Sequence, residues 1–416
     1  MYIRKFQKII HIELSSDMGK LCPDPGYTSA YVIFWWFGIC LGHREIVMAQ
    51  LPKNPAATRL LAVQTIAPTV AAYLSEQIAP LPDLDGLTAA DADSLLRRWE
   101  PLFKNWVDHR RQPSQATLSV VICTRDRPHF IETCLQSLQS LIQPPEEIIV
   151  VDNAPSSDAT RQIVARMPGI KYVLEPRPGL DFARNAGLAH STGEILAYTD
   201  DDVNVCPDWA LHLRRAFEDP TIMAMTGLVL AADLDTESQY IFEKYWSFNR
   251  GYVPRLYGQE FFQKYRYVGV PAWYVGAGAN MAFRRSCFES TGRFDERLDV
   301  GAAGCSGDSE MWYRVLAEGF TIRYEPLAVV AHTHRQEMSA LHKQLFYYMR
   351  GHVSELLIRF ERYRHLGNLV RLALLPVYFS SLLLLGWRSG WHRYKTVLTE
   401  MSGCLSGFKF YFGTAR

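Results

Sequence analysis

The sequence predicts an α/β protein built on a mostly parallel β-sheet with helices on both faces. Two observations carry this prediction. Strand-like and helix-like patterns alternate from residue 118 to 199, at roughly 25–30 residues per unit, as strands joined by helical crossovers require. Polar residues follow the strand-like runs, at the edge where such sheets bind ligands. We expect a small α/β module at 1–115, a central domain at 116–335 and a helical region at 336–416.

The N-terminal module begins with basic residues but has no long apolar core and no cleavage-like site, so we expect no signal peptide. An aromatic run at 31–46 predicts a core strand or hairpin, because its apolar stretch is too short to span a bilayer. Pro-rich stretches at 52–55 and 79–87 flank one helical pattern, and a second helical pattern ends near Trp106. The sequence assigns this accessory module no chemistry.

The central domain opens with continuous apolar runs that predict buried strands at 118–124, 146–152, 171–176 and 194–199. Helical patterns follow the first three runs, at 128–141, 157–167 and 182–190. Pro128 opens the first of these helices, because proline is favoured in the first turn.

Three adjacent carboxylates, Asp200, Asp201 and Asp202, end the fourth apolar run. Like charges this close repel, so a positive partner is expected. Mg²⁺ or Mn²⁺ would provide one, since these ions bind carboxylates and bridge them to substrate phosphates. An acidic turn or a helix N-cap is the alternative. The buried strand that leads into the carboxylates favours the metal.

Polar residues also follow the other strands. Thr124 and Arg125 come after the first, Asp152 ends the second, and Arg184 lies in the helix after the third. Asp152 could hydrogen-bond a base or a ribose, or make an Asx-turn. Arg184 could neutralise a diphosphate, or be a solvated helix residue. Several segments that aim polar groups at one crevice predict a ligand site.

Two later segments are candidates for the same crevice. The glycines of VGAGANMAFRR allow close approach of a ligand at Gly278 and Asn280; a tight hairpin is the alternative. Asp308 precedes the helical pattern MWYRVLAEG. It is either a general base that faces the crevice or a structural cap.

A strand-like run ends in His332 and, two residues on, His334, which therefore share one face. A neutral imidazole could complete a metal shell with Asp202, while a structural histidine is the alternative. The position at a strand end favours His332 as the metal ligand.

The net charge of +1 argues against a nucleic-acid-binding protein. Residues 337–416 carry eleven Lys/Arg and four Asp/Glu, a net charge of +7, which leaves −6 on the rest. This basic region predicts an anionic partner such as a membrane surface. The eight cysteines show no C-x-x-C pair and no zinc-type spacing, which indicates reduced thiols in a cytoplasmic protein.

Residues 372–387 hold no charge and lie between Arg371 and Arg388. As a helix they would reach ~24 Å, short of a hydrocarbon core of ~30 Å, and Pro376 would kink them. We favour a helix that lies in or dips into the cytoplasmic leaflet over a short span. A helix packed on the central domain is the third interpretation.

The order of LSVVICTRDRP, IIVVDNAPSSD, PGLDFARNAGL, YTDDD, GDSEMWYR and VVAHTH resembles family 2 glycosyltransferases of the GT-A fold. The resemblance covers 118–335, about half of the chain. It implies an inverting transfer of a sugar from a UDP-, GDP- or dTDP-sugar to a hydroxyl of a glycan or lipid-linked acceptor, with Mn²⁺ or Mg²⁺ as cofactor. It also implies cell-surface polysaccharide or glycolipid synthesis at the cytoplasmic face of the inner membrane.

The resemblance implies roles for individual residues. The residues expected to hold the donor nucleotide are Thr124, Arg125, Asp152, Arg184, Asp200 and Asp201. Gly278 and Asn280 are expected on the acceptor side. Asp202 would be the direct metal ligand of a D-x-D pair with Asp200, His332 a second ligand, and Asp308 the base. The family often has Glu at the position of Gly307. This departure alters the hydrogen-bonded support expected for Asp308.

Three other functions fit the sequence less well. A nucleotidyltransferase would need a Gly-rich basic loop after the first strand, and TRDRP has no glycine. A dinucleotide oxidoreductase would need G-x-G-x-x-G at the same place. A non-catalytic carbohydrate or nucleotide-sugar binding protein would not need Asp308, His332 and the three aspartates together.

Overall fold

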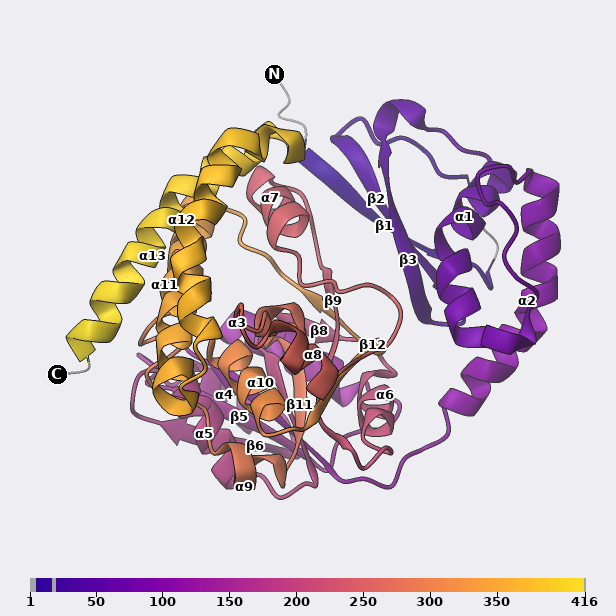
Figure 1. The fold of residues 1–416 in the computed structure, drawn as a ribbon. Helices are drawn as coiled ribbons and strands as arrows, with labels where there is room; N and C mark the ends of the chain where they lie inside the picture. The colour runs from indigo at the N-terminus through magenta and orange to yellow at the C-terminus, as the bar shows by residue number, and fades with distance from the viewer. Residues whose placement is uncertain (1–4, 17–19, 415–416) are drawn as a thin grey trace.

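The computed structural model describes residues 5–16 and 20–414, which form a central α/β domain, an N-terminal module and a bundle of C-terminal helices (Figure 1). A nine-stranded sheet forms the central domain, in the order β10-β12-β9-β11-β7-β4-β5-β6, with β8 paired to β12. Its strands are β4 (Leu118–Thr124), β5 (Glu147–Asn153), β6 (Ile170–Glu175), β7 (Ile195–Asp200), β8 (Val203–Val205), β9 (Ile222–Ala231), β10 (Arg255–Tyr257), β11 (Asn280–Arg284) and β12 (Thr321–His332).

The predicted α/β fold is confirmed, and the sheet is mixed. β4 pairs in parallel with β5 and β7, β5 with β6, and β12 with β9. β11 runs antiparallel to β7 and β9, while β8 and β10 run antiparallel to β12. Six strands therefore share one direction, and their carboxyl ends meet at one edge of the sheet.

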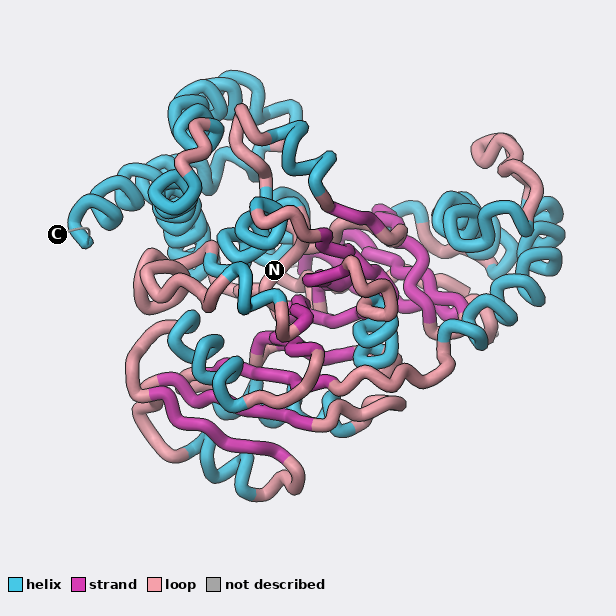
Figure 2. The backbone as a smooth tube through the Cα atoms, turned by 60° about the horizontal axis from the view of Figure 1, so that its bottom comes forward, coloured by secondary structure: helices cyan, strands magenta, loops and turns pink. Residues whose placement is uncertain are grey.

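Helices cover both faces of this sheet (Figure 2). The helices of the central domain are α3 (Pro128–Gln139), α4 (Ala159–Ala165), α5 (Leu180–His190), α6 (Trp209–Ala216), α7 (Glu237–Trp246), α8 (Gln259–Tyr265), α9 (Cys287–Thr291) and α10 (Gly307–Ala317). The alternation of strand side chains divides the core. Val120 of β4 packs in one apolar cluster with Ile131 of α3, and Val121 packs in the other with Trp312 of α10.

The N-terminal module pairs a small sheet with two helices. Its elements are β1 (Lys5–Glu13), β2 (Tyr27–Trp36), β3 (Ile39–Val47), α1 (Pro55–Leu74) and α2 (Ala89–Arg110). The expected aromatic hairpin is β2–β3, whereas β1, which pairs in parallel with β2, was not predicted. Tyr31 and Ile33 share an apolar cluster with Leu228 and Val329 of the central sheet, so the module packs on that domain.

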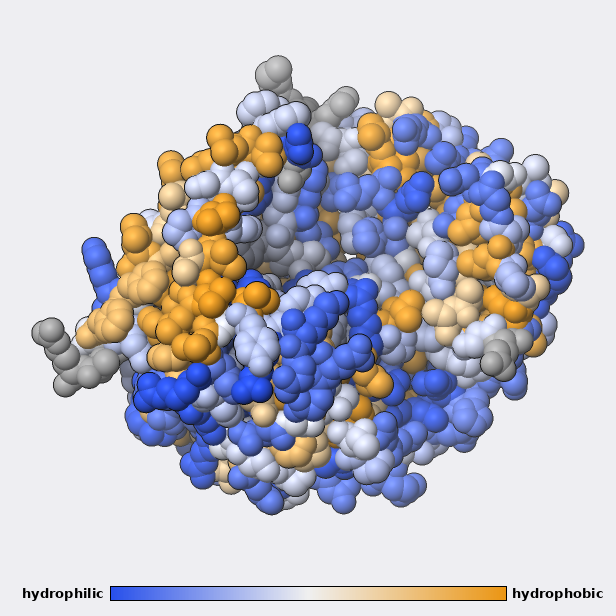
Figure 3. All heavy atoms as spheres, in the orientation of Figure 1, coloured by the Kyte–Doolittle hydropathy of each residue, from blue (hydrophilic) through white to orange (hydrophobic). Residues whose placement is uncertain are grey.

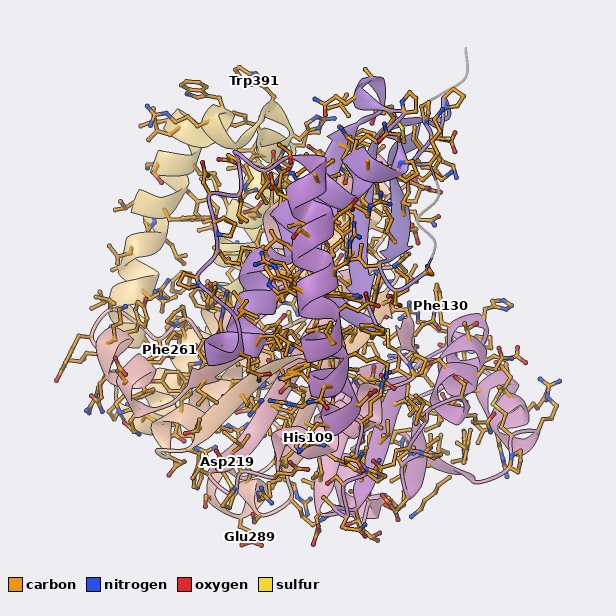
Figure 4. All side chains as sticks on the ribbon, turned by 90° about the vertical axis from the view of Figure 1, so that its right-hand side faces the viewer. His109, Phe130, Asp219, Phe261, Glu289 and Trp391 are labelled. Atoms are coloured by element: carbon orange, nitrogen blue, oxygen red, sulfur yellow. The ribbon has the colours of Figure 1, made fainter. Side chains whose placement is uncertain are left out.

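The C-terminal region is helical, as predicted: α11 (Met338–Tyr363), α12 (Gly367–Leu385) and α13 (Tyr394–Thr414). α13 lies close against α11, because a Cβ added at Gly403 would collide with the Phe346 carbonyl. Trp391 lies at the far end of this region from the base of the central domain, where Asp219 lies (Figure 4). Short 3₁₀ turns complete the chain at Met48–Gln50, Ser75–Gln77, Ala272–Tyr274, Gly386–Ser389 and Trp391–Arg393.

Candidate functional site

A cavity of about 900 Å³ opens at the carboxyl ends of β4 and β7. It is walled by the central domain and by α11 and α12, which sequence reasoning did not place there. The structure brings nine predicted site residues to its lining: Thr124, Arg125, Arg184, Asp200, Asp201, Asp202, Gly278, Asp308 and His332. Residues from six segments of the sequence thus meet in one crevice.

Asp200, Asp202 and His332 form a group whose ligand atoms all lie within 4.8 Å of one another. Asp202 is buried, and its Oδ1 has no hydrogen-bond partner among the described residues. His332 Nε2 lies 3.3 Å from that oxygen. Two carboxylates and an imidazole around an unpartnered oxygen fit Mn²⁺ or Mg²⁺.

Arg127 is the positive partner that the adjacent aspartates need, and sequence reasoning did not select it. Its Nη1 lies 2.5 Å from Asp201 Oδ1 and its Nη2 lies 2.6 Å from Asp202 Oδ2. The Thr124 hydroxyl donates to Asp201 Oδ2 at 2.7 Å. Asp201 is therefore tied to the end of β4 and stands outside the group that could hold a metal.

The environment gives the three carboxylates different charge states. Burial, and then the negative charge of Asp202, raises the pKa of Asp200 to about 7. Burial raises the pKa of Asp201 to about 6, although Arg127 opposes the shift. For Asp202 burial is outweighed by His332 and Arg127, so its pKa lies below the usual range. Asp202 is thus the carboxylate best kept charged for a cation.

His332 is prepared as a neutral ligand. Burial lowers its pKa to about 4, although Asp202 opposes this. Its Nδ1 lies 3.1 Å from His334 Nδ1, and His334 Nε2 lies 3.2 Å from Glu243 Oε2. These two contacts orient the imidazole ring of His332 so that its Nε2 faces Asp202. His334 is buried and outside the cavity lining, which fits the structural alternative for that residue.

Asp308 is the second residue of α10 and lines the cavity. Gly278 N–H donates to its Oδ2 at 2.8 Å, and Ser309 N–H donates to its Oδ1 at 2.7 Å. Burial raises its pKa to about 6, and nearby Arg184 limits the rise. α11 supports this turn, because the Ser309 hydroxyl donates to Glu355 Oε2 at 2.6 Å. A fixed carboxylate with such a pKa can accept a proton near neutral pH.

Arg184 is buried and already paired. Its Nη1 lies 2.9 Å from Asp181 Oδ1 and 2.6 Å from Asp299 Oδ2. Sequence reasoning missed both aspartates. A Cβ at Gly307 would collide with the Asp181 carboxylate, so Asp181 fills the space beside Asp308 that a side chain at 307 would need. A residue with a side chain at 307 would collide with the Asp181 carboxylate, which explains why glycine stands at this position.

Two predicted residues do not reach the cavity lining. Asp152 is buried, accepts a hydrogen bond from the Tyr172 hydroxyl at 3.0 Å and keeps an unpartnered Oδ1. The next residue, Asn153, lines the cavity instead, and its Oδ1 accepts from Gly179 N–H at 2.8 Å. A nucleobase bound in this cavity would therefore contact Asn153 and not Asp152.

Asn280 lies in the core and not on the acceptor side. Its Nδ2 donates to the carbonyls of Leu228 (3.1 Å) and Ala328 (2.9 Å), and its Oδ1 accepts from Trp209 Nε1–H at 2.9 Å. These bonds tie β11 to β9 and β12. Its neighbour Gly278 does line the cavity, next to Asp308.

Two cations on the lining were also missed. Arg335 Nη1 lies 3.8 Å from Asp202 Oδ2, and its side chain is 45% exposed. Lys343, in the second turn of α11, is exposed and lines the same cavity. The proximity of Arg335 to His332 in the sequence is the signal that could have identified it.

Residues 119–291 match the family model Glycosyl transferase family 2. The chain is 27% identical over 228 residues to the pre-mycofactocin glycosyltransferase of Mycobacterium tuberculosis, a match over 54% of this chain and 44% of that protein. It is 33% identical over 121 residues to the succinoglycan biosynthesis protein ExoM of Rhizobium meliloti, over 27% of this chain and 39% of that protein. The chain thus spans less than half the length of either relative.

Among solved structures, the mannosyltransferase PcManGT from Pyrobaculum calidifontis, in complex with GDP-Man and Mn²⁺, is similar with a TM-score of 0.46 and 20% identity. That alignment covers 73% of this chain and 94% of the other.

Proposed function

We propose that this chain is an inverting, metal-dependent glycosyltransferase, because residues 119–291 match the model of glycosyl transferase family 2. It moves a sugar from a UDP-, GDP- or dTDP-sugar to an acceptor hydroxyl in the synthesis of cell-surface polysaccharide or glycolipid. One observation carries the proposal. The cavity is lined both by Asp200, Asp202 and His332, which fit a divalent cation, and by Asp308, a fixed carboxylate with a pKa of about 6.

Asp200, Asp202 and His332 would hold Mn²⁺ or Mg²⁺, which when bound supplies a Lewis acid for the donor diphosphate. Asp308 takes the proton of the acceptor hydroxyl as its oxygen bonds to the anomeric carbon. The bond from that carbon to the diphosphate breaks on the opposite face, and a nucleoside diphosphate leaves. The hydrogen bonds from Gly278 and Ser309 hold the Asp308 carboxylate in place.

The first test is calorimetric binding of UDP, GDP and dTDP, each with and without Mn²⁺. We expect one of the nucleotides to bind tightly and to need the metal. Binding of none of them under either condition would refute the proposal and would favour a non-catalytic protein.

The pH profile should show the titration of Asp308. The base must be charged, so the rate is retained above its pKa and lost as the pH falls through about 6. We expect a one-proton acid limb near pH 6 in kcat/KM for the donor, measured from pH 5 to 9 at saturating Mn²⁺. A profile that stays flat down to pH 5 would contradict the assignment.

Arg335 and Lys343 should contribute more to diphosphate binding than Arg184, whose guanidinium already faces two carboxylates. The double variant Arg335→Ala/Lys343→Ala should weaken nucleoside diphosphate binding by about 10-fold or more, since each charge-assisted hydrogen bond contributes about 1.5–3 kcal/mol. Calorimetry with the diphosphate and the matching nucleoside checks this, because nucleoside affinity should not change. Equal losses for both ligands would contradict it.

We further propose that residues 116–335 are the catalytic domain, that residues 1–115 are accessory, and that α12 lies on the cytoplasmic face of the inner membrane. By length and composition alone Gly367–Arg388 could cross a membrane, and 17% of its most apolar stretch is buried in the protein. Leu374, Leu375 and Tyr378 of α12 line the cavity, and Arg371 donates to the Gly269 carbonyl at 2.9 Å. A helix with one face against the protein suits a membrane surface better than a span.

A further inference from the structure

Residues of α7, α10, α11 and α12 line part of the cavity, and we call this part its second half. We propose that this half binds the acceptor and that the acceptor is a glycolipid. The sugar head would bond to Trp246, Trp312 and Gln344, and the hydrocarbon chain would leave over α12. This inference rests on the proposed function and specifies its acceptor.

Unpartnered polar groups are the first observation. Trp246 Nε1–H, Trp312 Nε1–H and Gln344 Oε1 are buried atoms of cavity-lining residues and have no hydrogen-bond partner among the described residues. The Gln344 amide donates to the Tyr348 hydroxyl at 2.9 Å, which fixes the side chain and leaves its oxygen unused. Buried groups of this kind cost free energy unless a ligand bonds to them. Two donors and one acceptor match the hydroxyls of a sugar.

The apolar wall is the second observation. Leu374 and Tyr378 line the cavity and are also 48% and 47% exposed, so they belong to both the cavity and the outer surface. The spacing of helix positions puts Val370, Val377 and Leu384 on the same side of α12 as Leu374. These three side chains are 39%, 63% and 74% exposed. Apolar side chains gather over the C-terminal helices in Figure 3.

A hydrocarbon chain can therefore pass from the cavity to the outer face of α12 along apolar side chains. A water-soluble glycan would gain nothing from this wall, because its surface is polar. The net charge of +7 on residues 337–416 complements an anionic membrane, where a lipid acceptor would reside. Asp308 lines the same cavity, so a hydroxyl of the bound head can lose its proton there while the chain stays in the leaflet.

The test compares methyl and octyl β-glycosides of glucose, galactose and mannose, each below its critical micelle concentration. Calorimetry measures their binding to the full chain with Mn²⁺ and the nucleoside diphosphate present. For at least one sugar the octyl glycoside should bind about 10-fold tighter or better, because several methylene groups are buried. Leu374→Asp should reduce this preference to below about threefold.

Leu398→Asp is the matched control, since Leu398 lies on α13, away from the apolar face of α12, is 74% exposed and does not line the cavity. It should keep the preference for the octyl glycoside. Equal binding of methyl and octyl glycosides, binding of neither, or an equal loss in both variants would overturn the inference. Nucleotide binding in the same samples tests the proposed function separately, because it does not depend on the acceptor half.

Discussion

Asp308→Asn is expected to reduce sugar transfer by about 10²–10⁴-fold, the contribution of a well-placed general base. The amide has nearly the shape of the carboxylate but cannot accept the proton of the acceptor hydroxyl. Asp308 is also not one of the three residues that could hold the metal, which are Asp200, Asp202 and His332. Donor binding should therefore change by less than about threefold, a small fraction of the catalytic loss.

The measurement is release of nucleoside diphosphate from the donor in the presence of a membrane extract as the source of acceptor, together with calorimetry of the diphosphate. Asp219→Asn is the control, because Asp219 is an exposed carboxylate away from the cavity. A thermal melt of both variants excludes unfolding, which matters because two backbone N–H groups donate to Asp308. Normal turnover in Asp308→Asn would refute the assignment of the base.

The elements read correctly from the sequence share a local cause. β4 occupies the predicted range 118–124, and β5 and β7 lie within one residue of theirs, because continuous apolar runs bounded by polar residues are typical of strands buried on both faces. α3 begins at Pro128 as predicted. β1 was missed because its sequence, KFQKIIHIE, is only partly apolar and its pairing partner begins at Tyr27.

The candidate site could be predicted only as far as its strand ends. The pairing of Arg184 with Asp299 joins residues 115 positions apart, and no local pattern records such a contact. The same holds for Asp181, whose carboxylate excludes a side chain at Gly307. Asn280 was misplaced because Gly278 lies in the loop before β11 and lines the cavity, whereas Asn280 begins β11 and bonds to Trp209 and to the carbonyls of β9 and β12 in the core.

The cavity wall made by α11 and α12 could not be predicted either. An apolar segment with flanking arginines has the same composition whether its inner face meets a membrane, a protein core or a substrate. Only the fold shows that Leu374 and Tyr378 line the cavity that holds Asp308. The amino acids of a helix thus indicate that it needs an apolar neighbour, and the tertiary structure determines which one.

Asp202→Asn is expected to abolish the dependence of nucleotide binding on Mn²⁺ and to weaken binding in its presence by about 100-fold or more, since losing even an outer-shell partner costs 10–100-fold in metal affinity. Asp202 has the carboxylate whose pKa is held low, and its unpartnered Oδ1 faces His332. Calorimetry with and without Mn²⁺ measures the effect.

Asp201→Asn is a demanding control, because the two carboxylates are adjacent and share Arg127. Asp201 is held by Thr124 and Arg127 outside the metal group, so its variant should retain metal-dependent binding. Equal losses of metal-dependent binding in both variants would mean that the aspartates attract the cation by their summed negative charge and that Asp202 is not a specific metal ligand. Loss in Asp202→Asn alone would show that Asp202 acts as a metal ligand, since Asp201→Asn changes the formal charge by the same amount at the adjacent position.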